Sequence, residues 1–282
     1  MHLFLPRHLA ILVLLAVHIY GTACYAVQQS SSLEQSICGL KESFVFWLWS
    51  SAAGKPGAAR LAQVSNVEDV AITSSDGRIL HGYKLTPPHT RNGKDIPKGY
   101  LLVAQGNAML ADQIITHFNQ FAGLGYDVYI FDYRGYGRSE GKRRLKAILN
   151  DYHQIIQQLN TQPYQNRAFY GMSFGGVVLL DALRNQTGEM TVVIDSTPSR
   201  LSDYGCPAAH DPVNNLPRDT GNLLVIAGAK DQVVKPGASS ELLELAEDRG
   251  ATVLRPPTWG HPFMDSHTQR RLETVRRFLL HE

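Results

Sequence analysis

Three residues that could together activate a serine hydroxyl occur in the order Ser173, Asp231 and His261. Ser173 lies between Gly171 and Gly175 in the stretch "RAFYGMSFGGVVLL", which spells Gly-x-Ser-x-Gly. A serine hydroxyl is a weak nucleophile at neutral pH, so it needs a base, and the base needs an acid that orients it. The pattern predicts Ser173 as nucleophile, His261 as base and Asp231 as orienting acid. Because the five-residue pattern is weak on its own, this hypothesis depends on the surrounding elements.

Each partner has an alternative interpretation. Asp195, at the end of "VVIDS", is a rival acid, and Asp231 could instead cap a turn. His261 could be a surface histidine with no part in catalysis. Other histidines fall within or at the start of expected helices or in a strand, so we expect structural roles for them: His81, His117, His153 and His267.

The sequence gives little reason to expect a metal. The nearest approach to a ligand set is Cys206, His210 and Asp211, whose spacing is not that of a known metal site. We therefore expect no metal and no other cofactor.

From Val67 onward, strands alternate with helices, which predicts a mostly parallel sheet covered on both faces and opened by an antiparallel hairpin. The hairpin turns at Ser75-Asp76-Gly77. We expect eight strands, namely "VEDVAIT", "RILHGYKL", "YLLVAQ", "YDVYIFDY", "RAFYGM", "MTVVIDS", "NLLVIAGA" and "ATVLRPP". We expect helices over 111–124 and in "LKAILNDYHQIIQQLN", "GGVVLLDALRN", "SSELLELAEDRG" and "HTQRRLETVRRFLLHE".

This order of elements places the candidate residues at one edge of the sheet. Ser173 falls between a strand and a helix, where a sharp turn pushes the hydroxyl out and flanking glycines avoid collisions with the backbone. Asp231 and His261 each follow a later strand. The carboxyl ends of parallel strands meet at one edge, so all three side chains can converge there.

Composition is that of an ordinary globular protein, with 44% hydrophobic and 18% charged residues among 282. A net charge of +2 gives no reason to expect nucleic acid as a partner. One basic cluster, "KRRLK" at 142–146, indicates either a solvated helix face or contact with an anionic surface or substrate. Nothing in the sequence indicates the oligomeric state.

The N-terminus has its own character. Residues 1–23 combine Arg7, the apolar run "LAILVLLAVHIY" and the small residues "GTA", the plan of a secretory signal peptide. An uncleaved membrane anchor and a buried helix are the alternatives. Cys24 lies where a bacterial lipoprotein carries its lipidated cysteine, although Gly21 replaces the usual leucine. The expected location is exported, that is periplasmic or membrane-anchored.

Residues 24–66 form an N-terminal extension before the domain expected at 67–282. If Cys24 is lipidated or removed, Cys38 and Cys206 remain as a pair that an oxidising compartment could join; two unpaired buried thiols are the alternative. The aromatic segment "SFVFWLWSS" at 43–51 is too short to span a bilayer. It either packs on the body of the protein or contacts a membrane surface.

With these motifs in order, the chain resembles α/β-hydrolases of the serine-aminopeptidase-like and monoacylglycerol-lipase-like branch. The resemblance rests on "GMSFGG", on "DYRGYGRSEG" after the fourth strand, and on "AQGNA" after the third, which is similar to a His-Gly-Asn segment of depalmitoylating relatives. It implies an α/β-hydrolase fold, with an oxyanion hole made by the backbone N–H groups of Asn107 and Phe174. It also implies that Asp132, Arg134 and Ser139 hold a loop in shape without doing chemistry.

Two features depart from the family pattern. Gln105 replaces the usual histidine, and only a short segment separates "MTVVIDS" from "NLLVIAG", where many relatives insert a lid. We therefore expect little or no lid and an open site.

The predicted function is a serine hydrolase that cleaves carboxylic esters or thioesters through an acyl-enzyme intermediate. The small acyl substrate is the expected partner, with membrane-surface association as a further expectation. The alternatives are an aminopeptidase-like or lipase-like hydrolase, or a non-catalytic binding protein of the same fold.

Overall fold

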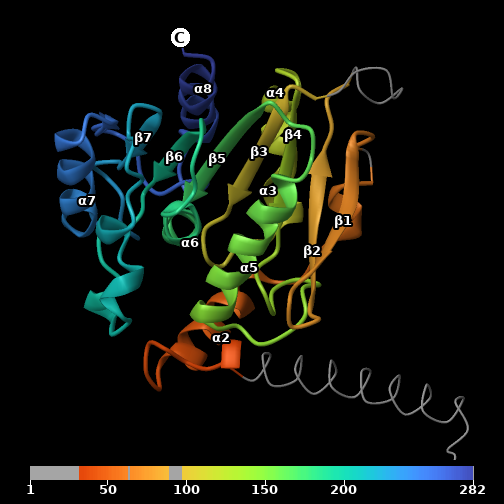
Figure 1. The fold of residues 1–282 in the computed structure, drawn as a ribbon, viewed down its shortest axis with the longest axis horizontal. Coiled ribbons are helices and arrows are strands. Elements are labelled where there is room, and N and C mark those ends of the chain that lie inside the picture. The colour runs from red at the N-terminus through yellow and green to blue at the C-terminus, as the bar shows by residue number, and fades with distance from the viewer. Residues whose placement is uncertain (1–31, 63, 89–96, 282) are drawn as a thin grey trace, which may run out of the picture.

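The computed structural model describes residues 32–62, 64–88 and 97–281 (Figure 1). The predicted signal or anchor at 1–23 and the candidate lipidation site Cys24 lie outside these residues. Within the described part of the chain, every helix is too short or too polar to span a bilayer.

Eight strands form one sheet in the order β1-β2-β4-β3-β5-β6-β7-β8. β1, β2 and β4 pair antiparallel, and all other neighbours pair parallel. The strands are β1 (Val67–Thr73), β2 (Ile79–Leu85), β3 (Gly99–Ala104), β4 (Tyr126–Phe131), β5 (Asn166–Met172), β6 (Thr191–Asp195), β7 (Leu223–Ile226) and β8 (Thr252–Leu254). The eight-stranded, mostly parallel sheet predicted from the sequence is confirmed.

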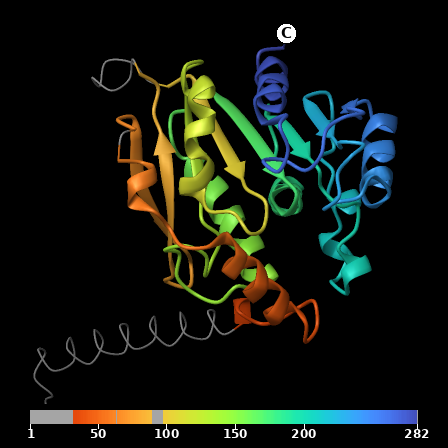
Figure 2. The same ribbon diagram turned by 180° about the vertical axis from the view of Figure 1, so that it is seen from behind.

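Both faces of the central strands β3 to β7 are buried, as their continuous apolar sequences predicted. In β3, Tyr100, Leu102 and Ala104 face one hydrophobic core, and Leu101 and Val103 face the other. The first core is covered by α2 (Glu42–Ala53), α5 (Leu145–Leu159), α6 (Phe174–Leu183) and α7 (Pro236–Asp248). The second is covered by α3 (Ala111–Ile114), η3 (Ile115–Phe118), α4 (Asn119–Ala122) and α8 (Thr268–Leu279), as Figures 1 and 2 show from opposite sides.

The single helix expected over 111–124 is wrong in detail, because the segment breaks into α3, η3 and α4. The break coincides with the run Ile114-Ile115-Thr116. β-branched residues lose side-chain freedom in a helix, so local preference there is weak. The broken segment still buries its apolar side chains, Ile114, Ile115 and Phe118 among them.

The connection between β6 and β7 carries no lid. Residues 196–222 contain only the three-residue 3-10 helices η4 (Ser202–Tyr204), η5 (Ala208–His210) and η6 (Pro212–Asn214). The expectation that this connection holds a short helix at most is therefore confirmed.

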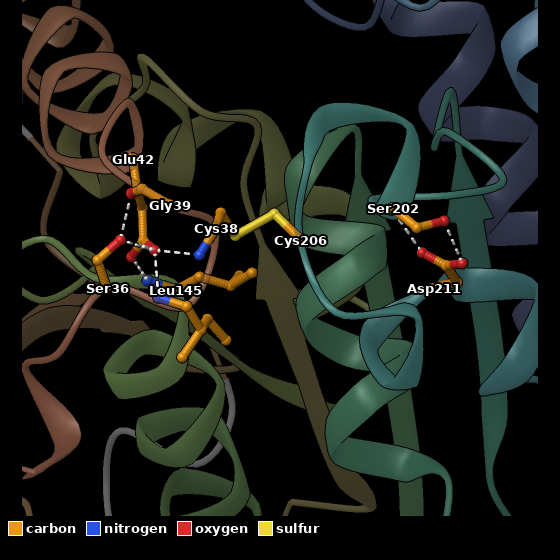
Figure 3. The surroundings of a disulfide bond; sticks show 9 residues. Ser36, Cys38, Gly39, Glu42, Leu145, Ser202, Cys206 and Asp211 are labelled. Atoms are coloured by element: carbon orange, nitrogen blue, oxygen red, sulfur yellow. Dashed lines mark hydrogen bonds between the residues drawn. A yellow bond between two sulfur atoms is a disulfide. The ribbon is translucent and has the colours of Figure 1, made fainter.

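Residues 32–62 pack against the body of the molecule. Cys38 and Cys206 form a disulfide with Cα atoms 4.0 Å apart, which decides between the two alternatives for these thiols (Figure 3). Nearby, a Glu42 carboxylate oxygen accepts the N–H of Leu145 at 2.9 Å. The short 3-10 helix η1 (Ala58–Arg60) follows α2, and Arg60 pairs with Asp112 at 2.7 Å.

Candidate active site

Ser173 occupies a strained turn between β5 and α6, with φ 54° and ψ −119°. A Cβ at Gly175 would lie 1.9 Å from the Ala104 carbonyl oxygen, and one at Gly171 would lie 2.7 Å from Gly176 Cα. The turn is secured because the Ser173 N–H donates to the Asp195 carbonyl at 2.8 Å. Left-handed backbone at a non-glycine residue is costly and persists only where its surroundings enforce it. The geometry is that of the strand-turn-helix context that the motif requires.

His261 and Asp231 meet at the same edge of the sheet. The Nδ1 atom of His261 lies 2.8 Å from Asp231 Oδ2. Asp231 Oδ1 also accepts the N–H groups of Val233 and Val234 at 2.8 and 2.9 Å. Burial raises the pKa of Asp231, but the hydrogen bond and charge of His261 and the two N–H donors together hold that pKa below its usual value. The carboxylate is thus fixed in its ionised form with one oxygen aimed at the imidazole.

Asp195, the rival acid, is occupied elsewhere. Its Oδ1 lies 2.6 Å from Arg271 Nη1, and its Oδ2 accepts the Tyr170 hydroxyl at 2.9 Å. Of the two candidate acids, the structure therefore brings Asp231 to His261.

Arg271 is a site residue that the sequence reasoning missed. Its guanidinium also donates to the Gly260 carbonyl at 2.8 Å and lies 4.7 Å from the centre of the Trp259 ring. Gly260 directly precedes His261, so the buried pair of Arg271 and Asp195 fixes the loop that carries the imidazole. No sequence signal marks Arg271, because it lies in an otherwise ordinary amphipathic helix.

The loop after β3 lies beside the serine. A Cβ built at Gly106 would lie 3.7 Å from Ser173 Cβ. Within the described residues, the backbone N–H groups of Asn107 and Phe174 donate to no other protein group. Both donors predicted for the oxyanion hole are therefore free to donate to a ligand oxygen.

Gln105, the departure from the family pattern, holds this loop. Its side-chain Nε2 donates to the Phe131 carbonyl at 2.9 Å, and its own carbonyl accepts the Tyr133 hydroxyl at 2.5 Å. The Asn107 side-chain oxygen accepts the hydroxyl of Tyr136. A glutamine thus supplies a side-chain anchor at this position.

The loop after β4 is built around internal contacts. Asp132 Oδ1 accepts the Ala111 N–H at 2.8 Å, and the Ser139 hydroxyl donates to the Asp132 carbonyl at 2.8 Å. Burial raises the pKa of Asp132 to about 6. Arg134 is fully buried and pairs with Asp76 at 2.5 Å and Asp151 at 2.6 Å. These contacts agree with a role in shaping the loop.

The weak candidate for a metal set is not assembled. Cys206 is in the disulfide, His210 Nδ1 lies 2.8 Å from Asp181, and Asp211 accepts the N–H of Ser202 at 2.8 Å. In the stretches of chain that the structure describes, no group of three or more acidic, histidine or cysteine side chains is arranged to hold a metal.

Comparisons with known proteins agree with this architecture. A family model described as serine aminopeptidase, S33, matches residues 95–209. An uncharacterized protein of Mycobacterium tuberculosis is 28% identical over 252 residues, which are 79% of this chain and 84% of that protein. The human alpha/beta hydrolase domain-containing protein 17C is 27% identical over 198 residues, 64% of this chain and 58% of that protein.

Among solved structures, the esterase Pf2001 of Pyrococcus furiosus superposes with a TM-score of 0.59 at 19% identity. The match covers 76% of this chain and 92% of the esterase. At this level of identity the likeness concerns the fold.

Proposed function

Because the chain belongs to the α/β-hydrolase superfamily, we propose that it hydrolyses carboxylic esters or thioesters through an acyl-enzyme intermediate on Ser173. The observation that carries the proposal is the pair of His261 and Asp231, 2.8 Å apart, at the same sheet edge as the strained Ser173 turn. A nucleophile, a base and an orienting acid at the ends of three strands are what acyl transfer needs.

In the first half of the reaction, His261 takes the Ser173 hydroxyl proton as Oγ attacks the substrate carbonyl carbon. Asp231 holds the imidazole through Nδ1, which leaves Nε2 to receive that proton and stabilises the imidazolium. Collapse of the tetrahedral intermediate breaks the bond to the alcohol or thiol, which leaves with the proton from His261. Water, deprotonated by His261, then attacks the acyl-enzyme. The bond between the acyl carbon and Ser173 Oγ breaks, Oγ takes back the proton from His261, and the carboxylic acid leaves.

The negative charge that develops on the carbonyl oxygen would be held by the N–H groups of Asn107 and Phe174. Loss of one such donor typically costs about 3 kcal/mol of transition-state stabilisation. Phe174 is the first residue of α6, so the positive end of the helix dipole adds to its N–H.

The short connection between β6 and β7 supports a site open to acyl chains of varied size. The assay includes both esters and peptides, because a serine, histidine and aspartate triad can cleave either kind of acyl bond. An aminopeptidase would cleave N-terminal residues from short peptides, whereas the proposed enzyme would not.

The test is labelling with a fluorophosphonate probe, followed by mapping of the modified peptide and assays with short-chain esters, thioesters and short peptides. We expect label at Ser173, its loss in Ser173→Ala, and hydrolysis that is at least about a thousandfold slower in that variant. Ser240→Ala is the matched control, because Ser240 is an exposed serine on α7. Folded protein that is neither labelled nor active would instead favour the binding-protein alternative, and hydrolysis that survives Ser173→Ala would overturn Ser173 as the nucleophile.

A further inference from the structure

Helix α2 is apolar on two opposite sides. Phe46 and Ala53 are buried in the first core, at 4% and 3% exposure. On the outside, Phe44, Trp47 and Leu48 are 63%, 51% and 50% exposed, and they follow the i, i+3, i+4 spacing of one helix face. Leu40, just before the helix, is fully exposed. Soluble proteins seldom leave such a set of large side chains on one surface without a partner.

This face is held rigidly to the body of the protein. At its start, Glu42 accepts the N–H groups of Cys38 and Leu145 at 2.8 and 2.9 Å, close to the disulfide (Figure 3). At its end, the Ala53 carbonyl accepts Gln113 Nε2 at 2.8 Å. Frayed or transient structure therefore does not explain the exposure of the outer side chains.

The charges around α2 have one sign at the surface. Between Ser32 and Leu61 the exposed charged residues are Lys41, Lys55 and Arg60, of which Arg60 is paired with Asp112 at 2.7 Å. The only acidic residues there, Glu34 and Glu42, are buried and bonded inward. Large aromatic and aliphatic side chains on a helix flanked by Lys41 and Lys55 suit the interface of an anionic bilayer.

We propose that the outer face of α2, formed by Leu40, Phe44, Trp47 and Leu48, docks the protein on an anionic lipid surface. The helix is too short to span a bilayer and would lie in its interfacial layer. The described chain begins at Ser32, shortly before α2, and the apolar run in residues 9–20 lies upstream. A membrane occupant is therefore favoured over a soluble protein partner.

Docking through α2 would place the catalytic serine near the lipid. The buried Phe46 ring of α2 contacts the Phe174 ring edge-on, with centroids 5.5 Å apart, and Phe174 directly follows Ser173. Figures 1 and 2 show α2 on the side of the molecule toward which β3 and β5 run. Provided that the protein has the proposed hydrolase function, its substrates would be acyl esters carried in a membrane.

The first test measures docking without any use of activity. Full-length protein is mixed with vesicles of phosphatidylglycerol and phosphatidylcholine whose acyl chains carry bromine, a short-range quencher of tryptophan fluorescence. We expect marked quenching that falls by at least half in the double variant Trp47→Phe, Trp49→Phe, which removes the two exposed tryptophans of α2. Trp259→Phe is the control that keeps the quenching, because Trp259 is buried in the protein at 5% exposure. Equal fluorescence with brominated and plain vesicles would overturn the proposal.

The second test compares a vesicle-borne ester with a water-soluble ester. Phe44→Ser and Leu48→Ser should slow hydrolysis of the vesicle-borne ester by about tenfold, since each loses a large apolar contact with lipid, and leave the soluble ester unaffected. Ile79→Ser is the matched control, because Ile79 is an exposed apolar residue on β2.

The two proposals can fail separately. If brominated vesicles quench the wild-type protein but it does not hydrolyse the soluble ester, the proposed function is wrong and the docking surface stands. A dimer in detergent that Phe44→Ser dissociates would overturn the docking proposal, because a second copy would then cover the face.

Discussion

At the scale of single residues, the two carboxylates that could orient His261 differ in what they contact. Asp231 bonds the imidazole and two backbone N–H groups, whereas Asp195 pairs with a buried guanidinium. The same substitution should therefore have different consequences at the two positions.

We expect Asp231→Asn to lower kcat by about 10³–10⁴-fold with a small change in stability, because the amide no longer fixes the imidazole tautomer or stabilises its charge. We expect Asp195→Asn to lower the free energy of unfolding by about 3 kcal/mol, because the buried Arg271 loses the carboxylate at 2.6 Å and keeps only the more distant Asp265 at 3.9 Å. Steady-state kinetics and urea unfolding of both variants check this pair. A larger loss of kcat in Asp195→Asn than in Asp231→Asn, with unchanged stability, would instead assign the orienting role to Asp195.

Asp132 offers a pH test of the loop after β4. Burial raises the pKa of Asp132 from 3.8 to about 6. The folded protein therefore binds this proton more tightly than the unfolded chain does, which stabilises the fold below the unfolded pKa. That stability is lost as the pH rises through about 6. The amide introduced by Asp132→Asn cannot ionise, and it keeps an oxygen for the Ala111 N–H. Relative to wild type, the variant should gain about 2–3 kcal/mol in free energy of unfolding between pH 4 and pH 7. Urea unfolding across this range measures it, and a pH-independent difference between the two proteins would contradict it.

Site residues that lie in short local motifs could be predicted from the sequence, whereas residues that only the fold brings together could not. Ser173, its glycines and the loop around Asp132 lie in short patterns whose geometry is local. Arg271 meets Asp195 across 76 positions of the chain, and nothing near either residue encodes that contact. The sequence predicts Asp231 as the acid, whereas the contact with Arg271 that occupies the rival Asp195 has no local signal.

At the scale of elements, strands were easier to predict than the helix over 111–124. The strands are continuous apolar runs between turn signals, and burial on both faces leaves few other conformations for them. The helix over 111–124 depends on packing more than on local preference, because its β-branched run favours no helix. Pairing of Cys38 with Cys206 could not be derived from three cysteines, since it depends on how the N-terminal segment docks.

The disulfide joins the segment before α2 to the connection between β6 and β7. It closes a loop with a sequence separation of 168, for which a chain-entropy treatment allows at most about 5 kcal/mol of stabilisation. We expect the double variant Cys38→Ser, Cys206→Ser to unfold at a clearly lower temperature than wild type. Calorimetry with and without a reductant checks it, since the reductant should affect wild type alone. Wild-type unfolding that is insensitive to reduction would argue that the bond does not form in solution.

At the scale of the whole molecule, the segment before β1 and the sheet domain share one polar network. Arg134, fully buried, pairs with Asp76 of the hairpin and Asp151 of α5, and it lies 3.5 Å from Glu34. Glu34 also accepts the N–H of Lys142 at 2.8 Å. The N-terminal segment thus completes contacts that stabilise the loop after β4, which in turn supports the site through Tyr133 and Tyr136.

These contacts predict that residues 32–62 are needed for stability of the remainder. A chain that lacks residues 1–62 loses Glu34, the buried Phe46 and the disulfide, and exposes the apolar surface beneath α2. We expect it to unfold at least about 10 °C below a control chain that lacks only residues 1–31, because a loss of 1 kcal/mol lowers the unfolding temperature of large domains by about 2–4 °C. Thermal unfolding followed by circular dichroism compares the two chains. Equal unfolding temperatures would mean that the segment rests on the sheet domain without stabilising it, and the rigid attachment of α2 inferred from its hydrogen bonds would then be weaker than its geometry indicates.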